Sequence, residues 1–149
     1  MLNIGQTFPD FTLPRDGGAA VQLSLIRPKR LILFAYGADG TPSCTQEVMD
    51  FNALSDDFAA KGAMVVGVSK DSPQKHDKFI AKMGIKIALA SDTGTFMEEI
   101  GAFGPKIFFG KPVIGVLRTT YLIDEKGILA KIWKVDKVKG HAAEVLAAL

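Results

Sequence analysis

Two short apolar runs, each followed by a stretch with helical spacing, constrain the fold of this chain most strongly. The runs are LILFAY at 31–36 and MVVGVS at 64–69, and their near-continuous apolar character is typical of strands buried on both faces. Apolar residues three or four apart predict a helix over 45–61, and Ser72 caps a second predicted helix over 73–84. Parallel strands joined by crossover helices are the simplest architecture for this order.

The remainder of the chain predicts a mixed sheet rather than a purely parallel one. We expect a third strand at 85–90 and a shorter helix from 95 to 103. TTYLID and ILAKIWKV, joined by a turn at 124–127, predict an antiparallel hairpin, and Gly140 precedes a last helix. The segment 104–116 holds two prolines and three glycines and is expected to be a loop. The predicted fold class is α/β, with a central mixed β-sheet flanked by helices.

Composition limits the class of protein and its partners. The 149 residues, 48% of them hydrophobic and 23% charged, fit one domain spanning 1–149. A net charge of +2 gives no reason to expect nucleic acid as a partner. The N-terminus lacks the pattern of a signal peptide, and no apolar run reaches the roughly 18 residues of a membrane span. With a single cysteine and therefore no internal disulfide, we expect a cytoplasmic protein in a reducing compartment.

That single cysteine, Cys44, lies between the end of the first buried strand and the start of the first helix. In parallel sheets, chemistry collects beyond the carboxyl ends of the strands. The N-terminus of a helix also favours a thiolate over a thiol. Because GADGTPSCTQE is polar and rich in turn residues, we expect the thiol to stay out of the core. The position favours a reactive thiol over a structural one.

Several thiol chemistries do not fit the surrounding residues. A dithiol reductase needs a second cysteine where Thr41 stands, and a cysteine hydrolase needs a histidine base. The only histidines, His76 and His141, are expected to be exposed helix residues, and no Cys, His and carboxylate cluster predicts a metal site. A peroxide remains as a substrate that a thiolate attacks directly, leaving a cysteine sulfenic acid.

Four segments in order resemble the peroxiredoxins, in particular the bacterioferritin comigratory protein (PrxQ-type) group. They are GQTFPDFTLPRDGG near the start, TPSCTQE at the cysteine, VVGVSKDSPQKHDKF in the middle and RTTYLIDEKG before the hairpin. The resemblance covers nearly the whole chain. It implies a thioredoxin-like fold and reduction of hydrogen peroxide or organic hydroperoxides without a cofactor.

The resemblance also implies roles for individual residues. Cys44 is similar to the peroxidatic cysteine, Thr41 to the threonine that orients the peroxide, and Arg118 to the arginine that keeps the thiolate charged. Glu47 is placed to pair with that arginine. Gly37 stands where the family usually has a proline that shields the site.

The residues at the family's resolving positions change the expected cycle. Where this group often carries a second cysteine, the chain has Met49 and Ile80, so it resembles the one-cysteine members. An external thiol (thioredoxin, glutaredoxin or a low-molecular-weight thiol) is then expected to regenerate Cys44. We expect a monomer or weak homodimer with no membrane partner. The alternative hypothesis is a thioredoxin-like redox sensor or binding module, whose cysteine is oxidised once without efficient turnover.

Overall fold

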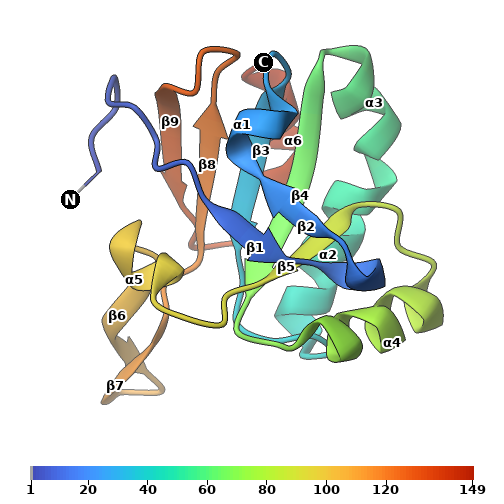
Figure 1. Cartoon of the computed structure of the whole chain (residues 1–149). Coiled ribbons are helices and arrows are strands. Elements are labelled where there is room, and N and C mark those ends of the chain that lie inside the picture. The colour runs from blue at the N-terminus through green and yellow to red at the C-terminus, as the bar shows by residue number, and fades with distance from the viewer. Residues whose placement is uncertain (1) are drawn as a thin grey trace.

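A computed structural model describes residues 2–149 and has a five-stranded sheet at its centre (Figure 1). The strand order is β5-β4-β3-β8-β9. The strands are β3 (Arg30–Ala35), β4 (Ala63–Ser69), β5 (Ala88–Ser91), β8 (Thr119–Ile123) and β9 (Leu129–Lys134). β3, β4 and β5 are mutually parallel, whereas β8 pairs antiparallel with both β3 and β9. The predicted mixed sheet is therefore confirmed.

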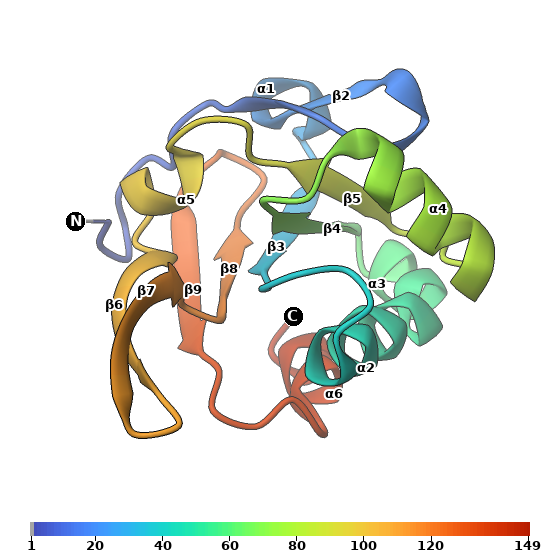
Figure 2. The ribbon, with the colours of Figure 1, turned by 90° about the horizontal axis from the view of Figure 1, so that it is seen from below.

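Alternate residues of β3 supply two separate cores. Leu31 and Leu33 face a cluster that includes the N-terminal segment and α5, while Ile32 and Phe34 face a cluster formed with α2, α3, α4 and α6. Figure 2 shows α2, α3 and α6 on one side of the sheet and α1 and α5 on the other. A central strand covered on both faces has to be apolar at every position, which explains the LILFAY run.

The remaining elements flank this sheet or precede it. They are β1 (Thr12–Pro14), a 3-10 turn η1 (Asp16–Gly18), β2 (Ala20–Gln22), α1 (Leu23–Ile26), α2 (Pro42–Ala53), α3 (Ser55–Ala60), α4 (Pro73–Met83), α5 (Phe96–Glu99), β6 (Phe103–Phe108), β7 (Lys111–Val116) and α6 (His141–Ala147). Over residues 2–149, the helices are all too short or too polar to span a membrane.

The single helix predicted over 45–61 is two helices in the structure. The first begins three residues earlier, with Thr41 as N-cap and Pro42 at its first position, where proline's missing N–H is not needed. It ends at Leu54, whose dihedral angles of −99° and 7° leave the helical range. Ser55 and the two aspartates after it then suit the first turn of a new helix, because acidic side chains favour helix N-termini.

The end signals of α4 are confirmed. The Ser72 hydroxyl accepts a hydrogen bond from the Lys75 N–H at 3.2 Å, and Gly84 closes the helix in the left-handed conformation at φ 67°. β5 begins three residues later than expected, and the helix predicted over 95–103 is the single turn α5.

The segment 104–116, expected to be a loop, is the hairpin of β6 and β7. Phe109 and Gly110 form its two-residue turn with φ values of 51° and 76°, the positive values that such a turn needs. Pro105 and Pro112 lie in its strands, and a two-stranded hairpin tolerates them because each strand has one free edge. The hairpin projects from the sheet (Figure 1).

Candidate active site

Cys44 lies in the first turn of α2, just beyond the carboxyl end of β3, and only 4% of its surface is exposed. The expectation of a thiol outside the core is therefore wrong. Because α2 begins at Pro42 rather than Thr45, Cys44 is already part of the helix and joins the apolar cluster on that face of the sheet. Gly37 lies next to the sulfur and has no side chain there, since a Cβ atom added to this glycine would lie 3.6 Å from Sγ.

Arg118 donates a hydrogen bond to the Cys44 sulfur, and two groups of the preceding loop also act on the thiol. The Arg118 Nη2 is 3.4 Å from Sγ and also donates to the Ser43 hydroxyl at 3.1 Å. The backbone of Ala38 and the hydroxyl of Thr41 lower the pKa of the thiol as well. In the structure that hydroxyl donates to the Ala38 carbonyl at 3.1 Å.

These groups, together with burial, determine the direction in which the pKa of Cys44 is shifted. Burial is the largest single influence and raises the pKa of the thiol, because a charged sulfur loses its hydration. The hydrogen bonds from Thr41, Ala38 and Arg118, together with the charge of Arg118, outweigh burial and leave the pKa of Cys44 below its usual value. A buried thiol is thereby prepared to react as a thiolate.

Glu47 holds Arg118 in place, as expected from the sequence. The Arg118 Nη1 donates to Glu47 Oε1 at 2.7 Å, and the carboxyl group is almost fully buried, with 1% of the side chain exposed. Burial raises the pKa of Glu47 from 4.5 to about 7, although Arg118 opposes this shift. Its second oxygen, Oε2, has no hydrogen-bond partner among residues 2–149, which agrees with a carboxyl group that ionises reluctantly.

Burial alone would lower the pKa of Arg118, but its neighbours reverse that effect. The charges and hydrogen bonds of Glu47 and Cys44 raise the pKa above its usual value. Arg118 therefore stays a cation beside the sulfur, and it is half-buried just before β8. The structure thus brings together Cys44, Thr41 and Arg118 from two distant parts of the chain.

A cleft of about 800 Å³ opens beside Arg118. Gly37 and Arg118, which both adjoin the sulfur, line it on one side, and Ile107, Phe108 and Leu117 form an apolar wall. The cleft therefore brings a small substrate to Arg118 and Gly37, the two lining residues that lie next to the sulfur.

Both histidines are buried, contrary to the expectation of exposed helix residues. His76 lies on the buried face of α4, and its Nδ1 is 2.6 Å from Asp39 Oδ2. His141 begins α6, and its Nε2 lies 2.8 Å from the Thr120 hydroxyl. Burial lowers the pKa of His141, so it favours the neutral form. Neither imidazole contacts Cys44, because each helix turns its histidine toward the sheet rather than toward the cleft.

The histidine on α4 also completes a cluster that the sequence did not predict. Ligand atoms of Asp39, Asp71 and His76 lie within 4.8 Å of one another. The chain's own groups already use their lone pairs: Asp39 accepts from Tyr36 and pairs with His76, and Asp71 pairs with Lys75 at 2.7 Å. We therefore interpret the cluster as a hydrogen-bond network rather than a metal site.

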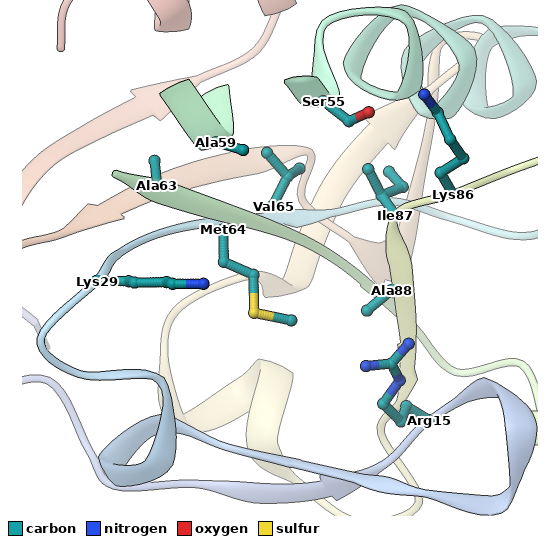
Figure 3. Close-up of a pocket in the computed structure, with 10 residues that line it drawn as sticks. All are labelled: Arg15, Lys29, Ser55, Ala59, Ala63, Met64, Val65, Lys86, Ile87 and Ala88. Carbon is teal, nitrogen blue, oxygen red and sulfur yellow. The ribbon is translucent and has the colours of Figure 1, made fainter. Parts of the chain in front are cut away.

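A second cavity, of about 260 Å³, lies at the opposite end of the sheet, where β4 and β5 begin (Figure 3). The side chains of Arg15, Lys29 and Lys86 surround it, together with Met64. Because Cys44 lies beyond the carboxyl ends of the same strands, this cavity is no part of the cysteine site.

The two positions where relatives often carry a second cysteine are half-buried. Met49 on α2 and Ile80 on α4 both pack against the apolar cluster around Cys44. Their side chains contribute apolar contacts, and neither carries a thiol that could attack the oxidised Cys44.

Comparison with known proteins identifies the family. The AhpC/TSA family matches residues 4–132. Peroxiredoxin Bcp of Bacillus subtilis is 40% identical over 149 residues, which cover 99% of this chain and 95% of that protein. Peroxiredoxin Bcp of Xanthomonas campestris is 39% identical over 141 residues, which cover 94% of this chain and 88% of that protein.

Solved structures agree with the sequence comparison. A cysteine-to-serine mutant of PrxQ from Xylella fastidiosa superimposes with a TM-score of 0.92 at 34% identity, covering 99% of this chain and 95% of that one. The Bcp of X. campestris, solved as trapped-intermediate and ligand complexes, gives 0.89 at 36% identity, with 98% and 96% covered. X. campestris peroxiredoxin Q has been solved with either of two cysteines replaced by serine. The chain belongs to the AhpC/TSA family and, within it, to the Bcp (PrxQ-type) peroxiredoxins, thiol-dependent peroxidases with a thioredoxin-like fold, of which it is a one-cysteine variant.

Proposed function

We propose that Cys44 is the peroxidatic residue of this peroxidase and that it forms a sulfenic acid. The observation that carries the proposal is the contact of 3.4 Å between Arg118 Nη2 and Sγ in a site that lowers the pKa of a buried thiol. The thiolate attacks one peroxide oxygen, the O–O bond breaks, and the other oxygen leaves as hydroxide or alkoxide. The leaving oxygen takes a proton, and Cys44 keeps the transferred oxygen as S–OH.

The donors around the sulfur fit this step. Negative charge moves from the sulfur to the departing oxygen, so a fixed cation and hydrogen-bond donors stabilise it along the whole path. Arg118 supplies the cation, and the Thr41 hydroxyl can turn from the Ala38 carbonyl toward the bound peroxide. The lowered pKa of Cys44 increases the share of thiolate, the form of the cysteine that attacks the peroxide.

Regeneration requires thiols from outside the chain. One external thiol condenses with the sulfenic acid to release water and form a mixed disulfide, and a second thiol reduces that disulfide and restores Cys44. Support comes from the composition, which holds one cysteine, and from Met49 and Ile80 at the two positions where a second is common. Thioredoxin, glutaredoxin and a low-molecular-weight thiol are the candidate reductants.

Hydrogen peroxide and organic hydroperoxides are both proposed substrates. The structure of the X. campestris Bcp is described in connection with its alkyl peroxide reduction activity. The apolar wall formed by Ile107, Phe108 and Leu117 beside Arg118 gives an alkyl group somewhere to pack. This wall supports organic hydroperoxides alongside hydrogen peroxide.

Peroxide consumption with each reductant tests the proposal. We expect sustained turnover with at least one thiol system and none after Cys44→Ser. The alternative function, a redox sensor, is favoured by the burial of Cys44 at 4% exposure, which restricts access of a bulky reductant. Oxidation of one equivalent of Cys44 followed by no further peroxide loss, with every reductant, would establish the sensor instead.

A further inference from the structure

One short loop lies against the Cys44 sulfur, since a Cβ added to Gly37 would lie 3.6 Å from Sγ, and two of its groups lower the pKa of the thiol. The loop joins β3 to α2, and it contributes the Ala38 backbone and the Thr41 hydroxyl. A donor on a loop stabilises a charge only if the loop is held in the right place before the reaction. Whatever fixes this loop therefore acts on the sulfur without touching it.

Asp39, next to Ala38, is where the loop is fixed. Its carboxylate is buried and accepts a hydrogen bond from the Tyr36 hydroxyl at 2.6 Å. Its other oxygen lies 2.6 Å from His76 Nδ1, and its backbone N–H donates to Asp71 Oδ2 at 2.7 Å. Burial and the Asp39 charge raise the pKa of Tyr36 well above its usual value, so the hydroxyl remains a donor.

The His76 ring is held at both nitrogens. Its Nε2 lies 3.0 Å from the Ala90 carbonyl in β5, and since a carbonyl oxygen only accepts, Nε2 carries a proton. Nδ1 lies against the Asp39 carboxyl group, so both ring nitrogens have a hydrogen-bond partner. These partners explain why the fold can bury His76 completely.

We propose that His76 is a positioning residue for the peroxidase: clamped between the Ala90 carbonyl and Asp39, it holds the β3–α2 loop in place against the Cys44 sulfur. His76 touches neither the sulfur nor the cleft. It acts through the loop, from a helix that lies far along the chain from Cys44. The inference rests on the function proposed above.

A matched pair of variants separates this role from a merely structural one. The amide nitrogen of Asn takes the place of imidazole Nδ1, and that of Gln takes the place of Nε2. His76→Asn can therefore keep the bond to Asp39 and lose the one to Ala90, whereas His76→Gln can keep Ala90 and lose Asp39. Both variants remove the buried ring, so both are expected to lose similar thermal stability.

The readouts are the pH profile of Cys44 alkylation by iodoacetamide and the rate of a single oxidation by hydrogen peroxide, both on folded protein. For His76→Gln we expect the alkylation profile to shift to higher pH. We also expect the oxidation to slow about tenfold, because this is the effect of losing one charge-assisted hydrogen bond. For His76→Asn we expect the profile to stay in place and the oxidation to remain within about threefold of the parent chain.

Identical profiles in the parent chain and both variants would overturn the proposal, and so would equal shifts in both variants. The alkylation profile needs no turnover. If the parent chain fails to consume peroxide with any thiol, the proposed function fails while the comparison of the two variants still decides the role of His76.

Discussion

The sulfur site and the β6–β7 hairpin border the same cleft, yet their side chains differ in burial and in the contacts that hold them. Around the sulfur, Arg118 and Glu47 are held by charge and hydrogen bonds at 2.7 Å, and the thiol is packed away from water. On the hairpin, Phe109 is 89% exposed and Ile114 73% exposed, so their apolar surfaces meet solvent. The sulfur site fixes its groups by hydrogen bonds and charge, whereas the Phe109 ring packs edge-to-face on Phe108 of the same hairpin, with centroids 4.4 Å apart.

The difference predicts which side of the cleft governs reactivity. A charged sulfur in a buried place depends on a few groups held within a fraction of an ångström, so single substitutions there have large effects. An exposed apolar side chain stabilises little inside its own chain, so single substitutions there have small effects on the fold. The following experiments measure this contrast.

Cys44→Ser carries the largest expected effect. Serine keeps the size of the side chain but has no thiolate at neutral pH, so we expect peroxide turnover to fall below detection, by at least about a thousandfold. Coupled peroxide consumption is the measurement. Ser43→Ala is the control, since it removes only an acceptor for Arg118 Nη2, and we expect it to retain turnover within about fivefold.

Arg118→Ala should slow the oxidation of Cys44 by hydrogen peroxide about a hundredfold, because it removes a fixed cation that faces the reacting charge. The pKa of Cys44 should also rise, since Arg118 is among the groups that lower it. Stopped-flow oxidation and the pH profile of alkylation measure the two effects. Lys134→Ala is the control, because Lys134 lines the same cleft. An unchanged pH profile in Arg118→Ala would show that α2 and its loop alone support the thiolate.

Glu47→Gln should flatten the dependence of stability on pH. Folding raises the pKa of Glu47 from 4.5 to about 7, so the folded chain binds a proton that the unfolded chain has lost between those values. This contribution is complete below pH 4.5 and is lost as the pH rises through about 7. We expect it to be about 3 kcal/mol.

Thermal or urea unfolding of the parent chain and the Glu47→Gln variant from pH 5 to pH 8 measures that slope. Asp56→Asn serves as the control, because the Asp56 side chain is 91% exposed and its replacement should leave the slope intact. Parallel stability curves for the parent chain and Glu47→Gln would contradict a raised pKa at Glu47.

The smallest effect is expected for the double variant Phe109→Ser and Ile114→Ser. Both side chains are largely exposed, so the free energy of unfolding should change by less than about 0.5 kcal/mol. The reaction of Cys44 with hydrogen peroxide should stay within about twofold. Unfolding curves and stopped-flow oxidation check both expectations, and a loss like that of Arg118→Ala would erase the contrast between the two regions.

Much of the fold was predictable from short-range signals. The apolar runs at 31–36 and 64–69 lie within a residue of β3 and β4, and Ser72 and Gly84 end α4 as expected. The β6–β7 hairpin was not predictable, because a Phe-Gly turn is a weak hairpin signal and its two prolines indicate breaks. Their tolerance depends on the free strand edges, which only the assembled fold defines.

The candidate site was likewise predictable only in part from the sequence. The place of Cys44 between a strand and a helix was visible locally, whereas Arg118 lies 74 residues away and was identified only through the family resemblance. The burial of Cys44 depends on a helix start three residues earlier than its spacing indicated. The pair of Asp39 and His76, 37 residues apart, had no sequence signal, since nothing local says that α4 faces the loop.

Phe109 lowers the stability of the fold. At φ 51° it adopts a conformation that disfavours a bulky residue by about 1 kcal/mol, and its ring adds apolar surface to water. Asparagine at this position would create Asn-Gly, the preferred pair for the same turn. A sequence optimised for stability alone would therefore discard Phe109, and its presence marks the tip of the β6–β7 hairpin as a place where this chain accepts a less stable fold.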